Sequence, residues 1–419
     1  MKTATLAVLE TEQELPKGWR WVRIADVCEI NPSRPKIDRS DSENTTFVPM
    51  PSVDGESGVI ANPLIRPYGE VRRGYTYFGE NDVLFAKITP CMQNGKHAIA
   101  RNLIGGFGFG TTEFHVLRPS PNVLPEWVHY YLRQPHYLKQ AVDQFSGTAG
   151  QQRLPESFLS QTKIPLPSVT EQKRIVRIIQ EQFLSVDRAR TATETQLDAA
   201  KALPSAYLQK IFSSEEAMEW PKKLLAELCD VKGGKRLPAG CDFAKVITPF
   251  PYIRVVDFAN GSVSMEGLKY LDKNTYDKIS RYIIRCDDVY ISIAGSIGII
   301  GIIPEKLDGA NLTENAARLI IKDKSVLSRN FLAQFLQTSI GQQAIKDRTN
   351  TVGQPKLALE RIKTIAMKIP PIQEQEIIST NLRRILKESA ELSTALEEQI
   401  NTINSMPAAI LRYAFSGEL

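Results

Sequence analysis

The chain contains one internal duplication. Residues 203–215 match residues 406–418 without a gap, so that Leu-Pro-Ser-Ala-Tyr falls on Met-Pro-Ala-Ala-Ile at an offset of 203 residues. The same offset places Glu171-Gln172 on Glu374-Gln375. An ordered series of such matches across 419 residues indicates two equivalent halves. The period is far longer than the roughly 20–50 residues of a solenoid repeat, so we predict two equivalent domains and not an array.

Each half is expected to carry the same two parts. The first is a mixed segment of short strand-like runs, such as 82–86 and 288–293, separated by glycine- and proline-rich turns. The second is a long helix that begins after a proline-containing stretch at 164–167 or 369–371, because proline cannot continue a helix. These features divide the chain into globular domains at 1–169 and 214–372 and long helices at 170–213 and 373–419.

A heptad-like stripe runs along each predicted helix and favours pairing with another helix. Its apolar members, which we expect to pair the helices, are Ile179, Phe183, Val186 and Leu197 in the first and Leu382, Leu386, Leu396, Ile400 and Ile403 in the second. The alternative is a single helix lying on its own globular core. A helix of ~32 residues would be ~48 Å long, however, which exceeds the face of a small domain.

The path of the chain indicates the direction of the two helices. The second globular segment must connect the end of the first helix to the start of the second, and compact domains often have close termini. Antiparallel helices meet this condition, whereas parallel helices would require the segment to bridge ~48 Å. We therefore predict an α+β fold, in which two mixed α/β domains are held apart by two long antiparallel coiled-coil helices with an approximate two-fold axis.

Composition indicates a soluble globular protein. Hydrophobic residues make up 42% and charged residues 24% of the chain, and the net charge of +5 is only a weak bias toward anionic partners. The chain has no apolar run of the ~18–20 residues that a membrane helix needs and no signal-peptide pattern, so we expect a cytoplasmic protein. The five cysteines are scattered without a CxxC pair and the four histidines lie in the first half, so no metal site is predicted.

The sequence shows no catalytic constellation. It lacks a GxxxxGK[ST] phosphate loop, a GxSxG nucleophile elbow and an HExxH metal motif. Residues 31–34, Asn-Pro-Ser-Arg, differ from the Asn-Pro-Pro-aromatic tetrad of amino-methyltransferases. We therefore predict a chain that is not an enzyme and that binds no cofactor itself.

Polar and basic loops follow strand-like runs in both halves, at 87–96 and 146–153 in the first and at 294–298 and 349–356 in the second. Lys and Arg neutralise phosphates, while Gln, Asn and Arg present paired groups to base edges in the major groove of DNA. The candidate DNA-binding residues are Arg72, Arg73, Lys87, Thr89, Gln93, Asn94, Lys96, Thr148, Gln151, Gln152, Arg153, Lys235, Arg236, Arg254, Ser296, Asn350, Gln354 and Lys356.

The sequence resembles a known family, the DNA sequence-specificity subunits of type I restriction-modification enzymes. The resemblance covers essentially the whole chain. Its most specific parts are Ile-Pro-Leu-Pro at 164–167 running into Thr-Glu-Gln-Lys-Arg-Ile-Val at 170–176, and the ending Ile-Leu-Arg-Tyr-Ala-Phe-Ser-Gly-Glu-Leu at 410–419. The opening Leu-Pro-Lys-Gly-Trp at 15–19 is also similar, whereas the second half departs from it with Ala-Met-Glu-Trp at 217–220.

The resemblance implies that each globular domain is a target recognition domain that reads one half-site of double-stranded DNA, with the helices as conserved spacers. It also implies that two methyltransferase subunits, which carry S-adenosylmethionine, dock on the helical region and that motor and endonuclease subunits join them. Two alternatives remain from the residues alone. One is a non-catalytic protein-binding scaffold with two equivalent interaction heads, and the other is an enzyme whose active site has no recognised motif.

Overall fold

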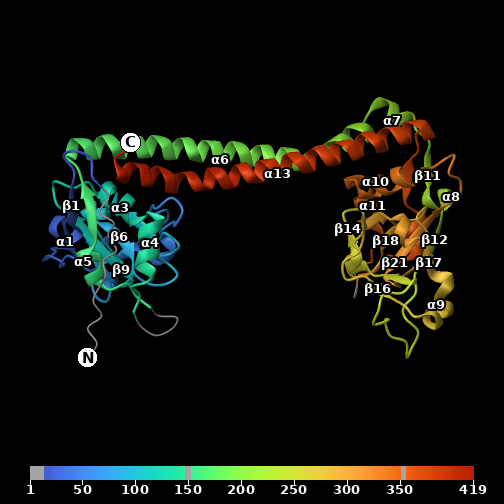
Figure 1. Ribbon diagram of the computed structural model, residues 1–419, viewed down its shortest axis with the longest axis horizontal. Coiled ribbons are helices and arrows are strands. Elements are labelled where there is room, and N and C mark those ends of the chain that lie inside the picture. Colours follow the sequence, from blue (N-terminus) through green and yellow to red (C-terminus); the bar gives the residue numbers. More distant parts are fainter. Residues whose placement is uncertain (1–13, 147–151, 351–354) are drawn as a thin grey trace. The chain divides into compact units, whose positions relative to one another are not determined.

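The computed structural model describes residues 14–146, 152–350 and 355–419. Contacts between residues divide the chain into two compact units. The first unit comprises Met1–Thr193 and Glu398–Leu419, and the second comprises Glu194–Glu397 (Figure 1). Each unit therefore combines a globular part with a segment of each long helix.

The first unit is built on two four-stranded sheets. One has the order β2-β9-β6-β7 and is antiparallel, with β2 (Cys28–Ile30), β9 (Phe114–Pro119), β6 (Val83–Ala86) and β7 (His97–Ile99). The other has the order β4-β3-β8-β5, with β4 (Leu64–Pro67), β3 (Asn44–Val48), β8 (Phe107–Gly110) and β5 (Thr76–Gly79). Strands β3 and β8 run parallel. Every residue of β6 is buried, as expected for a strand covered on both faces.

Short helices complete the first unit: α1 (Ile24–Val27), α2 (Tyr68–Val71), α3 (Pro125–Leu132), α4 (Pro135–Val142) and α5 (Glu156–Gln161). Helices α3 and α4 begin with proline, which suits the first helical position because the N–H there has no partner within the helix. Trp127 of α3 is fully buried, and its ring centroid lies 4.6 Å from that of Phe415. Strand β1 (Arg20–Arg23) pairs antiparallel with β10 (Lys163–Leu166).

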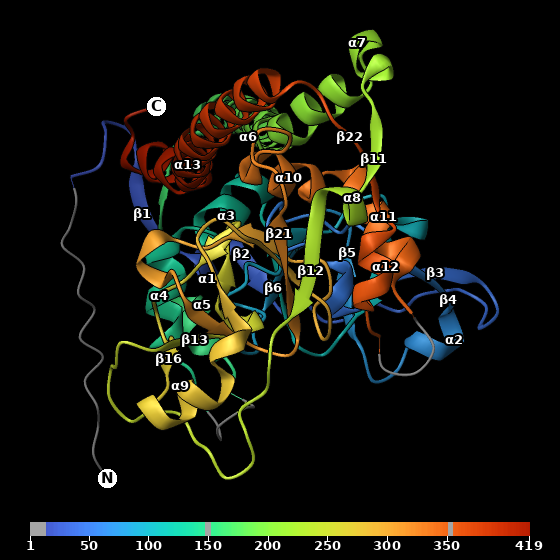
Figure 2. The same ribbon diagram turned by 90° about the vertical axis from the view of Figure 1, so that its right-hand side faces the viewer.

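The second unit repeats this plan (Figure 2). Its antiparallel sheet has the order β12-β21-β18-β19, with β12 (Cys229–Gly233), β21 (Ala316–Ile321), β18 (Val289–Ser292) and β19 (Ile300–Ile302). Its other four-stranded sheet has the order β16-β13-β20-β17, with β16 (Lys269–Tyr270), β13 (Pro251–Ile253), β20 (Ala310–Leu312) and β17 (Ile283–Ile284). Strands β13 and β20 run parallel, as β3 and β8 do.

The remaining elements of the second unit are two strand pairs and short helices. The pairs are β14 (Phe258–Ala259) with β15 (Ser262–Val263) and β11 (Lys222–Leu224) with β22 (Ala366–Lys368). The helices are α7 (Glu215–Glu219), α8 (Leu225–Leu228), α9 (Lys273–Ile279), α10 (Arg329–Gln337), α11 (Ser339–Arg348) and α12 (Leu359–Lys363). Short 3₁₀ turns lie at Met50–Ser52 and Ile104–Gly106 in the first unit and at Val255–Asp257, Ser280–Tyr282 and Glu305–Leu307 in the second. The matching sheet orders confirm the predicted duplication and the mixed α/β class.

Two long helices each contribute to both units. They are α6 (Val169–Phe212) and α13 (Ile372–Ser416), and each contains one proline, Pro204 and Pro407, 203 residues apart. The missing N–H and the ring of proline disfavour a helix interior, but the matched positions show that both halves accommodate it in the same place. A proline at this point does not end either helix.

Within each unit the segments of α6 and α13 run antiparallel. In the first unit, Arg174 Nη2 donates to Leu419 O at 2.6 Å, and Ile179 shares a core with Leu411. In the second unit, Ser389 Oγ donates to Ala200 O at 2.7 Å, and Phe212 shares a core with Leu382. In both units, residues late in one helix segment meet residues early in the other. This direction agrees with the prediction from the chain path.

Burial along the long helices follows a seven-residue period. Buried positions on α13 include Leu382, Ser389, Leu396 and Ile403, and each lies seven residues after the last. Of the other residues in the predicted stripe, Ile179 is buried, while Phe183, Val186, Leu197 and Ile400 are half-buried. Leu386 is 46% exposed because it lies on the row next to the buried one. The spacing of buried residues is that of a coiled-coil seam.

Candidate nucleic-acid interface

The two candidate loops of the first half lie against each other in the structure. A β-bridge joins Ile88 to Arg153, and Thr89 N donates to Gln152 O at 3.3 Å. Leu154 N donates to Lys87 O at 2.8 Å. The segment after β6 and the segment before α5, which are about 65 residues apart in sequence, therefore form one surface. Thr148 and Gln151 lie outside the described residues.

The second unit brings the equivalent loops together in the same way. Ala294 and Lys356 form a β-bridge, Leu357 N donates to Ile293 O at 2.9 Å, and Asn350 and Lys356 form a second bridge. Ser296, Asn350 and Lys356 are exposed on this surface. Gln354 lies outside the described residues. The paired-loop surface is thus present once in each unit, at equivalent places in the two sheets.

A carboxylate accompanies the cations of the first paired-loop surface. Arg153 donates to both carboxylate oxygens of Glu113, with its Nε 2.9 Å from Oε2 and its Nη2 2.7 Å from Oε1. This hydrogen-bonded pairing, reinforced by the charges of Arg153 and Lys87, holds the pKa of Glu113 below its ordinary value. The Arg153 guanidinium therefore has a fixed orientation without a ligand. This orientation favours a hydrogen bond of defined geometry over a purely electrostatic attraction.

Several other predicted DNA-binding cations are also held by internal partners. Arg72 lies 2.9 Å from Asp41, Arg254 pairs with Asp257 at 2.7 Å, and Arg236 pairs with Glu314 at 3.0 Å. Lys96 Nζ donates to Val53 O at 2.7 Å, and Lys235 Nζ lies 5.7 Å from the centre of the Tyr282 ring. Arg73 is exposed. These residues are distributed over separate loops, so they do not all belong to the paired-loop surfaces.

Gln93 and Asn94 border a hollow of about 460 Å³ together with Gly55, Glu56 and Arg133. Arg133 donates to three backbone carbonyls, those of Gly95 at 2.8 Å, Gly55 at 2.9 Å and Glu56 at 2.6 Å. Burial lowers the pKa of Arg133. The side chain thus ties two loops together through their backbones, which makes Arg133 an organising residue of this region.

Sequence reasoning did not identify Arg133 or Glu56 as part of this region. The one signal was a glycine match, because Gly58 and Gly261 are 203 residues apart and both have positive φ angles, 69° and 71°. A Cβ on Gly58 would meet the Arg133 guanidinium, and a Cβ on Gly261 would meet the amide of Gln337. The same close approach therefore recurs with an arginine in one unit and a glutamine in the other.

The corresponding region of the second unit contains a hollow of about 420 Å³, bordered by Gly295, Ile297, Gln342, Lys346 and Pro355, among others. Gln342 Nε2 donates to Gly298 O at 3.0 Å and to Leu336 O at 2.7 Å. Lys346 is the charged residue that borders this hollow, whereas both Glu56 and Arg133 border the first one.

Two further kinds of site, a metal-binding cluster and a membrane-spanning helix, were sought among the residues that the structure describes. Within those ranges, no group of three or more His, Cys, Asp or Glu side chains is placed to hold a metal ion. Among the same residues, no helix is both long and apolar enough to cross a bilayer.

Comparison with known families matches both halves of the chain. The family model described as the type I restriction modification DNA specificity domain matches residues 16–198 and again residues 218–402. The chain belongs to this family. The resemblance seen in the sequence is thereby confirmed.

Two curated relatives illustrate the range of similarity within the specificity family. The chain is 38% identical over 218 residues to the type I restriction enzyme EcoEI specificity subunit of Escherichia coli, a match that spans 51% of this chain and 36% of that one. It is 20% identical over 388 residues to the MjaVIII specificity subunit of Methanocaldococcus jannaschii, covering 88% and 87%. The stronger match thus extends over only about a third of the length of the E. coli relative.

Solved structures of similar fold cover nearly the whole chain. The HsdS subunit from Thermoanaerobacter tengcongensis has 22% sequence identity and a TM-score of 0.68, covering 98% of this chain and 100% of that one. A chain from a study of complex assembly and conformational transition in a type I restriction-modification system has 22% identity and a TM-score of 0.74, covering 97% and 100%. At this identity the likeness establishes the fold.

Proposed function

We propose that the chain reads a bipartite target in double-stranded DNA, with one half-site for each globular domain. The observation that carries this proposal is the repeated paired-loop surface, in which loop 87–96 meets Gln152 and Arg153 in one unit and loop 294–298 meets Lys356 in the other. Arg, Lys, Gln and Asn side chains are the types that contact phosphates and base edges. Two such surfaces on one chain suit a target in two parts.

The partners of this proposed reader follow from the family. Two methyltransferase subunits, which carry S-adenosylmethionine, would dock on the helical region formed by α6 and α13, and motor and endonuclease subunits would complete a cytoplasmic restriction complex. This chain would contribute sequence recognition and no cofactor of its own. The half-exposed apolar residues Leu386 and Leu392 of α13, 46% and 49% exposed, are consistent with a docking role for that helix.

The decisive experiment maps methylated adenines in cells that express the chain with its methyltransferase subunits. The expected result is two short half-sites separated by a constant unread stretch. Exchanging residues 16–150 for the equivalent part of a relative should then change one half-site and leave the other unchanged. A change in both half-sites would contradict modular reading by the two domains.

Salt dependence separates DNA reading from the alternative of a protein-binding scaffold. Binding to DNA releases counterions from phosphates, so affinity should fall steeply as the salt concentration rises from ~50 to ~200 mM. A scaffold that grips proteins through the same loops would show no affinity for duplex DNA under any of these conditions. The measurement uses the full chain in complex with its methyltransferase subunits and a duplex that contains the mapped target.

A further inference from the structure

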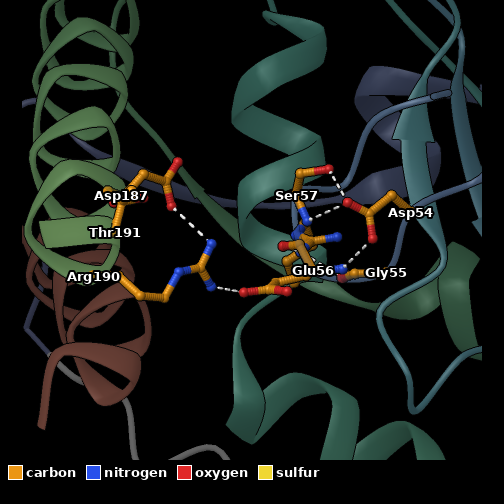
Figure 3. A network of polar contacts seen from close by, with 8 residues as sticks. Asp54, Gly55, Glu56, Ser57, Asp187, Arg190 and Thr191 are labelled. Atoms are coloured by element: carbon orange, nitrogen blue, oxygen red, sulfur yellow. Dashed lines mark hydrogen bonds and ion pairs between the residues drawn. The ribbon is translucent and has the colours of Figure 1, made fainter. Parts of the chain in front are cut away.

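The loop 54–58 of the first unit is a compact hairpin held by Asp54 (Figure 3). The Asp54 carboxylate accepts hydrogen bonds from Ser57 Oγ at 2.6 Å and from Glu56 N at 3.1 Å. The backbone of Asp54 closes the hairpin by accepting from Gly58 N at 3.0 Å and donating to Val59 O at 2.9 Å. The hydrogen bond from Ser57 holds the pKa of Asp54 below its ordinary value, so the carboxylate keeps this role at neutral pH. Glu56 is therefore presented from a fixed turn.

This hairpin and the loop that carries Gln93 and Asn94 form one body. A Cβ on Gly55 would collide with the carbonyl of Asn94, and a Cβ on Gly95 would approach Gly55 O, so the two backbones touch. The Arg133 guanidinium stabilises this contact because it donates hydrogen bonds to carbonyls in both loops. Movement of the hairpin would therefore carry the Gln93–Asn94 loop with it.

The hairpin is tied to the long helix by an ion pair. Glu56 forms this ion pair with Arg190 of α6, which also lies 3.4 Å from Asp187 one turn earlier (Figure 3). A second attachment lies near the start of α6, where the buried Gln172 bonds to Leu124 N at 2.9 Å and to Asn122 O at 3.1 Å. The two attachment points are 18 residues apart on the helix, which corresponds to ~27 Å.

Between these two points α6 also packs on the globular core through Ile179 and Phe183, and the Phe183 ring centroid lies 5.7 Å from that of Tyr130. The ion pair therefore lies seven residues, or ~10 Å, beyond Phe183 along the helix. Arg190 is 31% and Glu56 69% exposed in their side chains, so the pair contributes modestly, as partly exposed ion pairs do. An ion pair beyond the packed contacts resists movement of the hairpin away from the helix.

The second unit cannot form this ion pair. The corresponding hairpin is two residues shorter, with Ala-Asn-Gly-Ser at 259–262 between Phe258 and Val263, and it contains no carboxylate. Ser393 takes the place of Arg190 at the offset of 203 residues. The equivalent of the Gln172 attachment is nevertheless present, because Gln375 bonds to Ser328 N and Val326 O at 2.8 Å each. The charged attachment is thus a feature of the first unit alone among these equivalent positions.

We propose that Glu56 and Arg190 form a positioning latch, which fixes the tilt of the first globular domain on α6 and thereby sharpens recognition of the first half-site. Glu56 and Arg190 act through the Gln93–Asn94 loop and do not themselves read bases. The half-site part of this inference rests on the proposed function, whereas the latch itself does not. Recognition of the second half-site is independent of the latch.

The test uses the full-length variants Glu56→Gln, Arg190→Gln and the double variant in complex with the methyltransferase subunits. The control is Arg177→Gln, which removes an exposed cation from the same helix whose ion pair, with Glu181 at 3.8 Å, stays within that helix. Glu56→Gln makes the chain more positive and Arg190→Gln makes it less positive. If the substitutions acted only through general attraction to phosphates, Glu56→Gln would raise the affinity for DNA and Arg190→Gln would lower it. Loss of the latch instead lowers discrimination at the first half-site in both variants.

Methylation mapping should show that discrimination between correct and near-correct first half-sites falls about twofold to fivefold in both single variants, equivalent to ~0.4–1 kcal/mol. The double variant should be no worse than either single one, because the partners share one interaction. Discrimination at the second half-site, and at both half-sites in the control, should match the unchanged chain. Equal loss at both half-sites, or no loss at the first, would overturn the proposal.

Amide hydrogen exchange of the same proteins tests the latch without DNA. Residues 54–58 and 93–96 should exchange faster in Glu56→Gln and Arg190→Gln than in the unchanged chain or the control. Unchanged exchange would overturn the latch even if methylation were affected. If the unchanged chain directed no sequence-specific methylation, the proposed function would fail, while faster exchange in these segments would still establish the latch.

Discussion

Gln172 and Gln375 make the same three hydrogen bonds in their respective units. Each accepts at Oε1 from the backbone N–H of the residue at or just before the start of a short helix, Leu124 at 2.9 Å or Ser328 at 2.8 Å. Each donates from Nε2 to a carbonyl two residues earlier in that loop and to the proline carbonyl five residues before itself. Both side chains are fully buried. The repeated Glu-Gln motif is therefore a joint between long helix and globular domain.

Replacing Gln172 with leucine should destabilise the first unit by about 1–3 kcal/mol, because the leucine fills the space but leaves buried backbone groups without partners. Amide hydrogen exchange should report this as faster exchange around residues 122–124 and 163–167. Gln375→Leu should do the same in the second unit. The matched control is Lys173→Leu, at an exposed position of the same helix. Unchanged exchange in Gln172→Leu would rule out the joint.

Burial of His97 should make the first unit sensitive to acid. The ring stacks on Phe85 with centroids 4.0 Å apart, Nδ1 accepts from Ala86 N, and burial lowers the pKa of His97 to about 3. The unfolded chain takes up a proton near pH 6.5 and the folded one does not, so this stability is present above pH 6.5 and is lost as the pH falls toward 3. At pH 5 the loss should be ~2 kcal/mol relative to pH 7.5.

His97→Ile removes this proton linkage and copies the second half, which has Ile300 at the offset of 203 residues. Unfolding of the variant, followed from pH 7.5 to 5, should show a shallower loss of stability. Burial also lowers the pKa of His129, so part of the slope should persist. The second half contains no histidine and provides an internal control. An equal slope in the variant would show that His97 does not control the acid response.

Arg153 and Glu113 should have opposite effects on DNA binding. Arg153→Ala is expected to cost ~1–3 kcal/mol of discrimination at one base position if the guanidinium contacts a base edge. Glu113→Gln removes the carboxylate that Arg153 now binds, so affinity for duplex DNA at low salt should rise. Measuring the affinity of Arg153→Ala for duplexes that differ at single base pairs distinguishes a base contact from a phosphate contact. Equal weakening of all duplexes by Arg153→Ala would assign Arg153 to a phosphate.

Inserting seven residues after Thr191 in α6, together with seven after Glu398 in α13, should lengthen the unread part of the proposed target. The insertion adds ~10 Å of helix, about three base pairs, and keeps the seven-residue period of the buried positions. It also leaves the Arg190 contact with Glu56 in place. Mapping methylated positions gives the spacer length directly. A functional variant with an unchanged spacer would contradict a role of the helices as a ruler.

Local patterns in the sequence were sufficient to predict the elements that depend on periodicity. The duplication, the two long helices and their seven-residue stripe each follow from the spacing of residues such as Leu382 and Leu396. Leu386 satisfied the same pattern but is 46% exposed. Positions spaced alternately three and four residues apart form two adjacent rows on a helix, and one of these rows is the buried one. The width of the surface that packs against the helix decides which residues of the other row are covered.

Contacts between distant loops could not be predicted in this way. Arg153 was selected for its charge and its loop, but its pairing with Glu113 depends on how the two segments meet across the sheet. The role of Arg133 has no sequence pattern, because its three partners are backbone carbonyls, which every residue possesses. Composition provides no signal for such an interaction.

The sequence by itself determined that the chain has two equivalent halves, each with a mixed domain and a long helix, because repetition and hydrophobic spacing are properties of residue order. The tertiary structure decided which polar residues share a surface and which are already paired. It also distinguished the halves, since Glu56 meets Arg190 in one unit, whereas the shorter hairpin at 259–262 and Ser393 carry no charge in the other. Electrostatic and hydrogen-bonding partners are set by distance in space, which sequence separation does not specify.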